Sequence, residues 1–296
     1  MKGFFRGVAT AMPTPFLKGK IDYSTLEKLI DSQTSAKIDA LVFLGTTGEP
    51  CSLSERERSD VFRFAVEKAK GKTKLIFGAG SNDTKTAVSL AKKAEKAGAD
   101  GLLVVTPFYN KCTQKGLIKH YEAICSNVDI PVLAYNVPSR TGMNILPQTL
   151  EKLSYLPNFA GLKDASGNIT QSMEYVRLCK DKCDLFVGDD SLSLPLLSLG
   201  YKGVISVVSN LVPWDFVKLY GHVSRGELTA ASALFDKLLP LINACFAEVN
   251  PIPLKTALSL LGQGNGSLRL PLTRASAKTK KLLLKELKAY GFKVEN

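Results

Sequence analysis

The chain has 296 residues, of which 45% are hydrophobic and 22% are charged, and its formal net charge is +12. This is an ordinary soluble globular composition, with enough length for a large core. No apolar run reaches the roughly 18 to 20 residues that a membrane-spanning helix needs, which argues against a membrane protein. The segment Met1–Arg6 is too short and becomes polar too early for a signal peptide, so a cytoplasmic location is expected.

The cysteines are scattered and predict free thiols. No Cys-x-x-Cys pair occurs, and Cys179 and Cys183 are spaced as on one face of a helix. With only His120 and His222 in the chain, a zinc cluster is not expected. Reduced thiols are typical of a cytoplasmic protein. We therefore expect no metal.

The net charge of +12 allows two interpretations, a nucleic-acid-binding surface or a solvated basic surface. Lysines are spread along most of the expected helices. The densest basic run, residues 278–288, includes Glu286 and four leucines, as an amphipathic terminal helix does. The pattern favours a solvated surface without a nucleic-acid partner.

Eight short runs rich in Val, Ile, Leu, Phe and Ala predict strands. Near-continuous apolar runs are typical of strands that are buried on both faces. The runs cover residues 7–11, 40–44, 74–78, 101–105, 131–135, 159–163, 185–188 and 203–207.

Helical patterns separate these strands. Ser24 with Glu27, and Ser54 with Glu57, have the spacing of a capping box, and Thr84 is the expected cap of the next helix. Eight strand–helix units predict an α/β fold, a (β/α)8 or TIM barrel. A doubly wound open sheet is the alternative, but the number of units and the lack of a Gly-x-Gly-x-x-Gly loop after the first strand favour the barrel.

The barrel is expected to occupy residues 1–225. The remaining residues, 226–296, show no strand pattern and lack the composition of a linker. They predict a C-terminal helical extension packed on the barrel. Its helices are expected to cover residues 228–250, 254–261 and 276–290, with a break at Pro251-Ile-Pro253.

Lys163 ends the sixth strand in an apolar run. Gly161, Lys163 and Ala165 share one face of that strand, so only small residues flank the lysine. Removal from water favours the uncharged amine, which is a nucleophile toward carbonyl groups. A lysine whose head reaches solvent is the alternative.

Other reactive side chains also follow strands, and in a (β/α)8 barrel the strand ends meet at one rim. Thr46 and Thr47 lie in a tight turn suited to a carboxylate or a phosphate. Tyr135 is a candidate proton carrier, and Arg140 can bind an anion through two hydrogen bonds. This set, without histidines or a carboxylate cluster, suits Schiff-base chemistry on a small anionic keto acid. It suits neither phosphoryl transfer, a metal hydrolase nor a serine triad.

Three motifs resemble those of the dihydrodipicolinate synthases. They are Gly45-Thr-Thr-Gly-Glu49, Tyr135-Asn-Val-Pro-Ser-Arg-Thr-Gly142 and Gly161-Leu-Lys163. That family belongs to the pyruvate-dependent class I aldolases, together with N-acetylneuraminate lyase. The resemblance covers essentially the whole chain, including Asn250-Pro-Ile-Pro-Leu-Lys255.

The resemblance implies condensation of pyruvate with L-aspartate 4-semialdehyde to 4-hydroxy-tetrahydrodipicolinate, the first committed step of the diaminopimelate route to lysine. It implies a covalent imine and no separate cofactor. The implied catalytic residues are Lys163 for the imine and Tyr135, Thr46 and Tyr109 for a hydroxyl relay. The implied substrate-binding residues are Thr47, Arg140, Gly188 and Ile205.

The resemblance also implies self-association. Tyr109 is expected to reach the site of a neighbouring subunit, in a homodimer or in a homotetramer built as a dimer of dimers. Arg140 favours a short substrate with a carboxylate over a sialic acid, although another Schiff-base lyase and a catalytically silent barrel are alternatives. Because Cys51, Arg58 and Thr86 depart from the pattern of lysine-inhibited members, weak or absent lysine feedback is expected.

Overall fold

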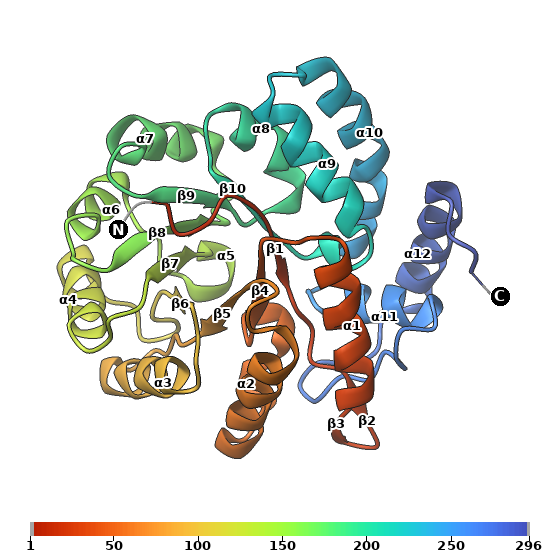
Figure 1. Cartoon of the computed structure of the whole chain (residues 1–296), viewed down its shortest axis with the longest axis horizontal. Helices are drawn as coiled ribbons and strands as arrows, with labels where there is room; N and C mark the ends of the chain where they lie inside the picture. The colour runs from red at the N-terminus through yellow and green to blue at the C-terminus, as the bar shows by residue number, and fades with distance from the viewer. Residues whose placement is uncertain (1–2, 295–296) are drawn as a thin grey trace.

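Eight parallel strands close into a barrel in the order β1-β10-β9-β8-β7-β6-β5-β4 (Figure 1). The computed structural model describes residues 3–294. The barrel strands are β1 (Gly7–Ala11), β4 (Ala40–Phe43), β5 (Lys74–Gly78), β6 (Gly101–Val105), β7 (Val132–Asn136), β8 (Phe159–Asp164), β9 (Asp184–Val187) and β10 (Gly203–Ser206). All eight predicted strands are present, and no boundary differs from its expected position by more than one residue. The prediction of a (β/α)8 barrel is confirmed.

Helices alternate with these strands and surround the barrel (Figure 1). They are α1 (Tyr23–Ser35), α2 (Glu55–Ala69), α3 (Thr84–Lys96), α4 (Gln114–Cys125), α5 (Pro138–Thr141), α6 (Pro147–Leu153), α7 (Ile169–Cys179), α8 (Ser193–Ser198) and α9 (Pro213–Ser224). The hairpin of β2 (Phe16–Leu17) and β3 (Lys20–Ile21) was not predicted, because two-residue strands are too short to show a period.

The structure corrects two of the predicted helix caps. Asp22, not Ser24, caps α1, and Asp83, not Thr84, caps α3. The actual cap lies two residues before the predicted one at α1 and one residue before it at α3. In both cases the aspartate carboxylate accepts a hydrogen bond from a free N–H group of the first turn. The capping box of Ser54 and Glu57 at α2 is confirmed.

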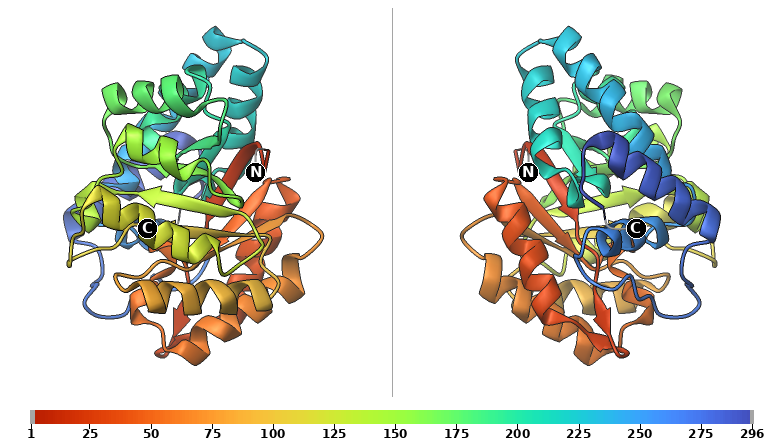
Figure 2. Two further views of the ribbon diagram at one scale, coloured as in Figure 1. Left: turned by 90° about the vertical axis from the view of Figure 1, so that its left-hand side faces the viewer. Right: turned by 90° about the vertical axis from the view of Figure 1, so that its right-hand side faces the viewer.

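Three helices follow α9 and form the expected extension: α10 (Leu228–Cys245), α11 (Ile252–Leu260) and α12 (Ala277–Tyr290). Figure 2 shows them on the side that faces the viewer in the right-hand view. The predicted helix over residues 228–250 is wrong at its end, because α10 stops at Cys245. The predicted break at Pro251-Ile-Pro253 is also misplaced, because α11 begins at Ile252, with Pro253 inside its first turn. The boundary at residue 225 between the barrel and the extension stays a prediction.

Among residues 3–294, α10 is the one helix long and apolar enough, by length and composition, to cross a membrane. It carries Asp236 and Lys237 near its middle, and it packs against α9 and α12. Its apolar face therefore serves the fold.

The amino-terminal end of the barrel is covered by the chain that precedes β1. The backbone N–H groups of Gly3 and Phe4 donate hydrogen bonds to the carboxylate of Asp184, the first residue of β9. The ring of Phe5 stacks on Phe186 inside the barrel, with ring centroids 4.2 Å apart. This apolar packing leaves the carboxyl ends of the strands as the place for a polar site.

Candidate active site

Six of the eight predicted site residues line one cavity of about 310 Å³, which we call the Lys163 cavity. They come from the ends of four strands and the turns that follow them. The six are Thr46, Thr47, Tyr135, Arg140, Lys163 and Gly188. The rule that parallel strands present reactive residues at their carboxyl ends therefore brought most of the predicted residues to one cavity.

Lys163 lies on β8 with only 5% of its surface exposed. Its register partner on β7 is Tyr135, and its Nζ lies 4.3 Å from the centroid of the Tyr135 ring. Among residues 3–294, no carboxylate forms an ion pair with this amine. The strand thus places a buried amine without a counter-ion beside a phenol, as expected for a nucleophile and a proton carrier.

Two glycines make this placement possible. A Cβ atom on Gly188 would lie 2.9 Å from both Cγ and Cε of Lys163, so any side chain there would displace the lysine. A Cβ atom on Gly161 would lie 1.9 Å from the carbonyl oxygen of Asp184 on the adjacent strand. Gly188 therefore preserves space for the amine, and Gly161 allows β8 and β9 to approach.

Thr46 and Thr47 belong to a short 3-10 turn, η1 (Thr46–Gly48), directly after β4. Thr47 is buried and its hydroxyl accepts a hydrogen bond of 3.0 Å from Nδ2 of Asn250. The carbonyl oxygen of Asn250 accepts a hydrogen bond of 3.1 Å from the guanidinium of Arg140. Asn250 thus joins the threonine turn to the arginine on α5.

Asn250 is a functional candidate that sequence reasoning missed. It lies just beyond α10, and the Asn250-Pro-Ile-Pro253 motif was interpreted as a helix break and as part of the resemblance. Asp189, Asn243 and Phe246 also line the Lys163 cavity without having been predicted. Asp189 could have been predicted, because it directly follows a predicted strand. Asn243 and Phe246 could not, because no local sequence signal shows that the end of α10 lies over the barrel.

Two predicted residues lie outside the Lys163 cavity. Ile205 is fully buried among the side chains inside the barrel, and Val207, two residues later, lines the cavity. Tyr109 is 91% exposed, and its backbone has a left-handed conformation, with φ 70°. The chain by itself therefore does not bring Tyr109 to Lys163.

A second cavity of about 510 Å³, the Arg269 cavity, adjoins the first and shares Thr46, Tyr135, Arg140 and Asn250 with it. Its other lining includes three residues expected to bear on lysine feedback, Cys51, Arg58 and Thr86. Three arginines face it, Arg58, Arg140 and Arg269, against the single carboxylate of Glu49. The cavity therefore favours anionic over cationic ligands.

The carboxylate of Glu49 is itself paired. Its Oε1 lies 2.5 Å from Nζ of Lys255, and both side chains are buried. Burial lowers the pKa of Lys255, although the adjacent carboxylate opposes that shift. Among residues 3–294, no three His, Cys, Asp or Glu side chains form a group that could hold a metal ion.

Comparisons with known proteins agree with this geometry. A model of the dihydrodipicolinate synthetase family matches residues 4–290. The chain is 46% identical over 292 residues to the 4-hydroxy-tetrahydrodipicolinate synthase of Caldicellulosiruptor bescii, covering 98% of this chain and 99% of that protein.

Solved structures show the same relationship. The dihydrodipicolinate synthase of Thermotoga maritima is 43% identical with a TM-score of 0.96, over 97% of this chain and 99% of that one. The chloride-inhibited dihydrodipicolinate synthase of Acinetobacter baumannii, complexed with pyruvate, is 36% identical with a TM-score of 0.95, over 97% of this chain and 99% of that one. With the barrel, the buried lysine and the threonine turn in place, these matches establish that the chain belongs to the dihydrodipicolinate synthetase family.

Proposed function

We propose that Lys163 forms the covalent imine through which this enzyme condenses pyruvate with L-aspartate 4-semialdehyde. The activity is that of a 4-hydroxy-tetrahydrodipicolinate synthase, a lyase-class enzyme of lysine biosynthesis through diaminopimelate. The observation that carries the role of Lys163 is a buried amine without a counter-ion beside Tyr135, at the rim of a closed barrel.

The reaction begins when Nζ of Lys163 attacks C2 of pyruvate and a water molecule leaves. The resulting imine withdraws electrons, so the methyl group loses a proton and an enamine forms. The enamine carbon then attacks the aldehyde carbon of the semialdehyde, and the aldehyde oxygen takes up a proton. The amino group of the adduct finally attacks the imine carbon, which closes the ring and releases Lys163.

Tyr135 and Thr46 move protons in these steps, because both line the Lys163 cavity and carry hydroxyl groups. Thr47 binds the carboxylate of pyruvate, and Arg140 binds the carboxylate of the semialdehyde by charge-assisted hydrogen bonds. Gly188 keeps the space beside the amine open. Ile205 contributes from β10 through its backbone, below the cavity.

Tyr109 completes the hydroxyl relay in the site of a second subunit. A tyrosine that is 91% exposed in one chain is better explained by a contact with another copy than by solvent. Leu270, which lines the Arg269 cavity, is also 80% exposed. The assembly is a homodimer or a homotetramer, and in the tetramer the exposed Ile169 and Met173 on α7 offer a further apolar contact.

The enzyme acts in the cytoplasm and needs no nucleic-acid or membrane partner. Support for this location comes from the six cysteines, all of which are free thiols, including the adjacent Cys179 and Cys183. Free thiols persist where the surroundings are reducing.

Trapping with borohydride tests the proposal. Pyruvate and borohydride are expected to add one reduced pyruvate adduct to the peptide that contains Lys163, and Lys163→Ala is expected to lose both the adduct and the activity. We expect aspartate semialdehyde, and not a sialic acid, to be the substrate that reacts with the pyruvate imine and releases Lys163. An adduct that persists in Lys163→Ala would rule out this assignment.

Feedback by lysine is expected to be weak or absent. An inhibitor with a cationic side chain needs a free carboxylate, but Glu49 is neutralised by Lys255. Arg58, whose guanidinium donates to the carbonyl oxygen of Pro50, adds positive charge to the Arg269 cavity. Steady-state rates measured with increasing lysine are expected to change little. Half-inhibition below about 1 mM, roughly −4 kcal/mol of binding free energy, would contradict this expectation.

A further inference from the structure

The turn that carries Thr46 and Thr47 begins and ends on strained residues. Leu44 precedes it with φ 54°, and Glu49 follows it with φ 52°. Non-glycine residues keep a left-handed conformation only where surrounding contacts hold them there. The contacts of Glu49 therefore decide where the two threonine hydroxyls lie.

Glu49 is held by a lysine from the C-terminal extension. The side chains of Glu49 and Lys255 are 2% and 4% exposed, and Oε1 lies 2.5 Å from Nζ. The same Nζ donates a hydrogen bond of 2.8 Å to the carbonyl oxygen of Thr14. The hydroxyl of Thr14 in turn donates to the carbonyl oxygen of Gly48, at 2.7 Å. One ammonium group thus restrains both the end of the turn and the residue that supports it.

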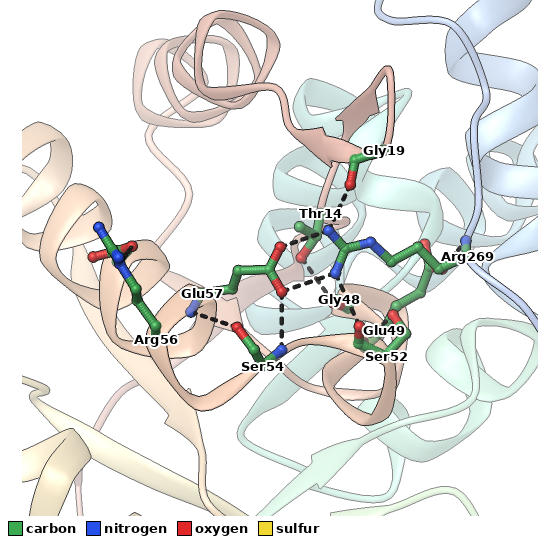
Figure 3. Close-up of polar contacts among 10 residues, drawn as sticks. Thr14, Gly19, Gly48, Glu49, Ser52, Ser54, Arg56, Glu57 and Arg269 are labelled. Atoms are coloured by element: carbon green, nitrogen blue, oxygen red, sulfur yellow. Dashed lines mark hydrogen bonds and ion pairs between the residues drawn. The ribbon is translucent and has the colours of Figure 1, made fainter.

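Arg269 restrains the other carboxylate oxygen of Glu49, whose Oε2 accepts a hydrogen bond of 3.2 Å from the Arg269 backbone N–H. The guanidinium of Arg269 lies between the carboxylate of Glu57 and the carbonyl oxygens of Ser52 and Gly19 (Figure 3). Its hydrogen bonds lower the pKa of Glu57 to about 2. Both oxygens of Glu49 are therefore bound by residues of the extension.

We propose that Glu49 and Lys255 are positioning residues that hold the Thr46–Thr47 turn in its catalytic conformation. A surface ion pair would not suffice, because water screens it and its partners separate at little cost. If a buried ion pair separates, each charge remains buried without a partner, which is energetically costly. The turn therefore keeps one arrangement. This inference rests on the roles proposed above for Thr46 and Thr47.

The test measures KM for each substrate separately. Glu49→Gln and Lys255→Met are each expected to raise KM for pyruvate by about tenfold or more, because displaced groups lose their fit to the bound substrate. KM for the semialdehyde is expected to change by less than about twofold, since Arg140 bonds the backbone carbonyl of Asn250, whereas the turn meets only the Asn250 side chain. The double variant is expected to match the single ones rather than multiply their effects, because both lose the same contact.

A control variant that lowers stability elsewhere distinguishes a positioning role of Glu49 and Lys255 from a general loss of stability. Leu283 is fully buried on α12, which packs on α10 and α11, so Leu283→Ala is expected to lower Tm by loosening the extension. Its KM for pyruvate is expected to stay within about twofold of the parent value. Lys255→Arg, which keeps the cation, is expected to recover most of the pyruvate affinity that Lys255→Met loses.

Thr47→Val distinguishes failure of this inference from failure of the underlying site. If Thr47→Val raises KM for pyruvate but Glu49→Gln does not, the positioning role is overturned and the role of Thr47 stands. If Thr47→Val has no effect, both are overturned. If Leu283→Ala raises KM for pyruvate as much as Glu49→Gln does, the positioning role is also overturned. Should the single variants fail to fold, the double variant, which leaves no unpaired buried charge, is compared with Leu283→Ala by the same criteria.

Discussion

Gly188 leaves the space that the side chain of Lys163 occupies. Alanine at this position would bring a Cβ atom within 2.9 Å of Cγ and Cε of Lys163 and 3.1 Å of Cβ of Ala165. Gly188 does not have a positive φ, so the backbone accepts alanine and the steric effect falls on the lysine. Gly188→Ala is expected to fold but to form the imine on the order of a hundredfold more slowly.

The time course of borohydride trapping with pyruvate measures this loss. Gly221→Ala is a matched control, because its Cβ atom would meet only the flexible end of Arg225, 3.2 Å away. That variant is expected to trap pyruvate at the parent rate. Equal trapping rates for Gly188→Ala and Gly221→Ala would contradict the prediction.

Asp190 gives the fold a pH dependence of its own. Burial raises its pKa to about 6, although backbone N–H groups of Val207 and Val208 donate to its carboxylate and oppose the shift. A carboxyl group whose pKa is higher in the folded chain stabilises the fold below its unfolded pKa, and this contribution disappears as pH rises through the folded value. About two pKa units correspond to ~3 kcal/mol.

Asp190→Asn removes this titration while keeping an oxygen acceptor for the two N–H groups. Its free energy of unfolding relative to the parent is expected to rise by about 3 kcal/mol between pH 4 and pH 7. Urea unfolding of both proteins at fixed protein concentration, repeated across that range, measures the difference. Parallel stability curves would show that Asp190 does not titrate as its burial indicates.

Sequence reasoning at this scale found residues at strand ends and in the turns that follow them. Lys163, Tyr135 and Thr47 were predicted because a parallel barrel sends its strand ends to one rim. Asn250 was missed because its contact with Thr47 joins positions 203 residues apart in the chain. Such a contact depends on how the extension packs, and no local pattern encodes that.

Among the elements, strands were predicted better than helix caps. Strands buried on both faces have nearly continuous apolar sequences that end abruptly, so their boundaries are readable. Cap identity depends on backbone conformation, and several polar residues compete near each helix start. At α1, Asp22 rather than Ser24 is the cap, because its carboxylate accepts hydrogen bonds from both the backbone N–H and the hydroxyl of Thr25.

The caps of α1 provide a direct test. Asp22→Ala is expected to lower the free energy of unfolding by about 1 kcal/mol, because it leaves the first turn of α1 without its acceptor. Ser24→Ala, two positions on, removes no cap and is expected to change stability by less than about 0.5 kcal/mol. Thermal or urea unfolding of the two variants compares the positions. A larger loss of stability in Ser24→Ala than in Asp22→Ala would show that Ser24 is the cap.

At the scale of the whole molecule, the extension completes the site. The barrel supplies the amine, the phenol and the threonine turn, while Asn250, Lys255 and Arg269 reach back to that turn from beyond α10. Leu270 is exposed at the Arg269 cavity, and Tyr109 is exposed next in the chain to Phe108, which lines that cavity. The single chain therefore brings together Lys163, Tyr135 and Thr46 but not Tyr109, the fourth predicted catalytic residue.

Complementation between two inactive variants tests whether Tyr109 acts across subunits. Lys163→Ala lacks the amine, and Tyr109→Phe lacks the phenol proposed for its neighbour's site. In a mixed dimer, one site pairs an intact Lys163 with an intact Tyr109 from the other chain, and the second site lacks both. Random mixing makes half of the dimers mixed, so about a quarter of the parent activity is expected to return.

The two variants are unfolded together, refolded as a mixture, and assayed beside each variant refolded alone. Parent protein carried through the same procedure gives the reference activity. If Tyr109 serves the Lys163 of its own chain, every site in the mixture contains one defect and no activity returns above the sum of the separate variants. Recovery near a quarter therefore requires a site shared between chains, and it makes the dimer the smallest fully active form of the enzyme.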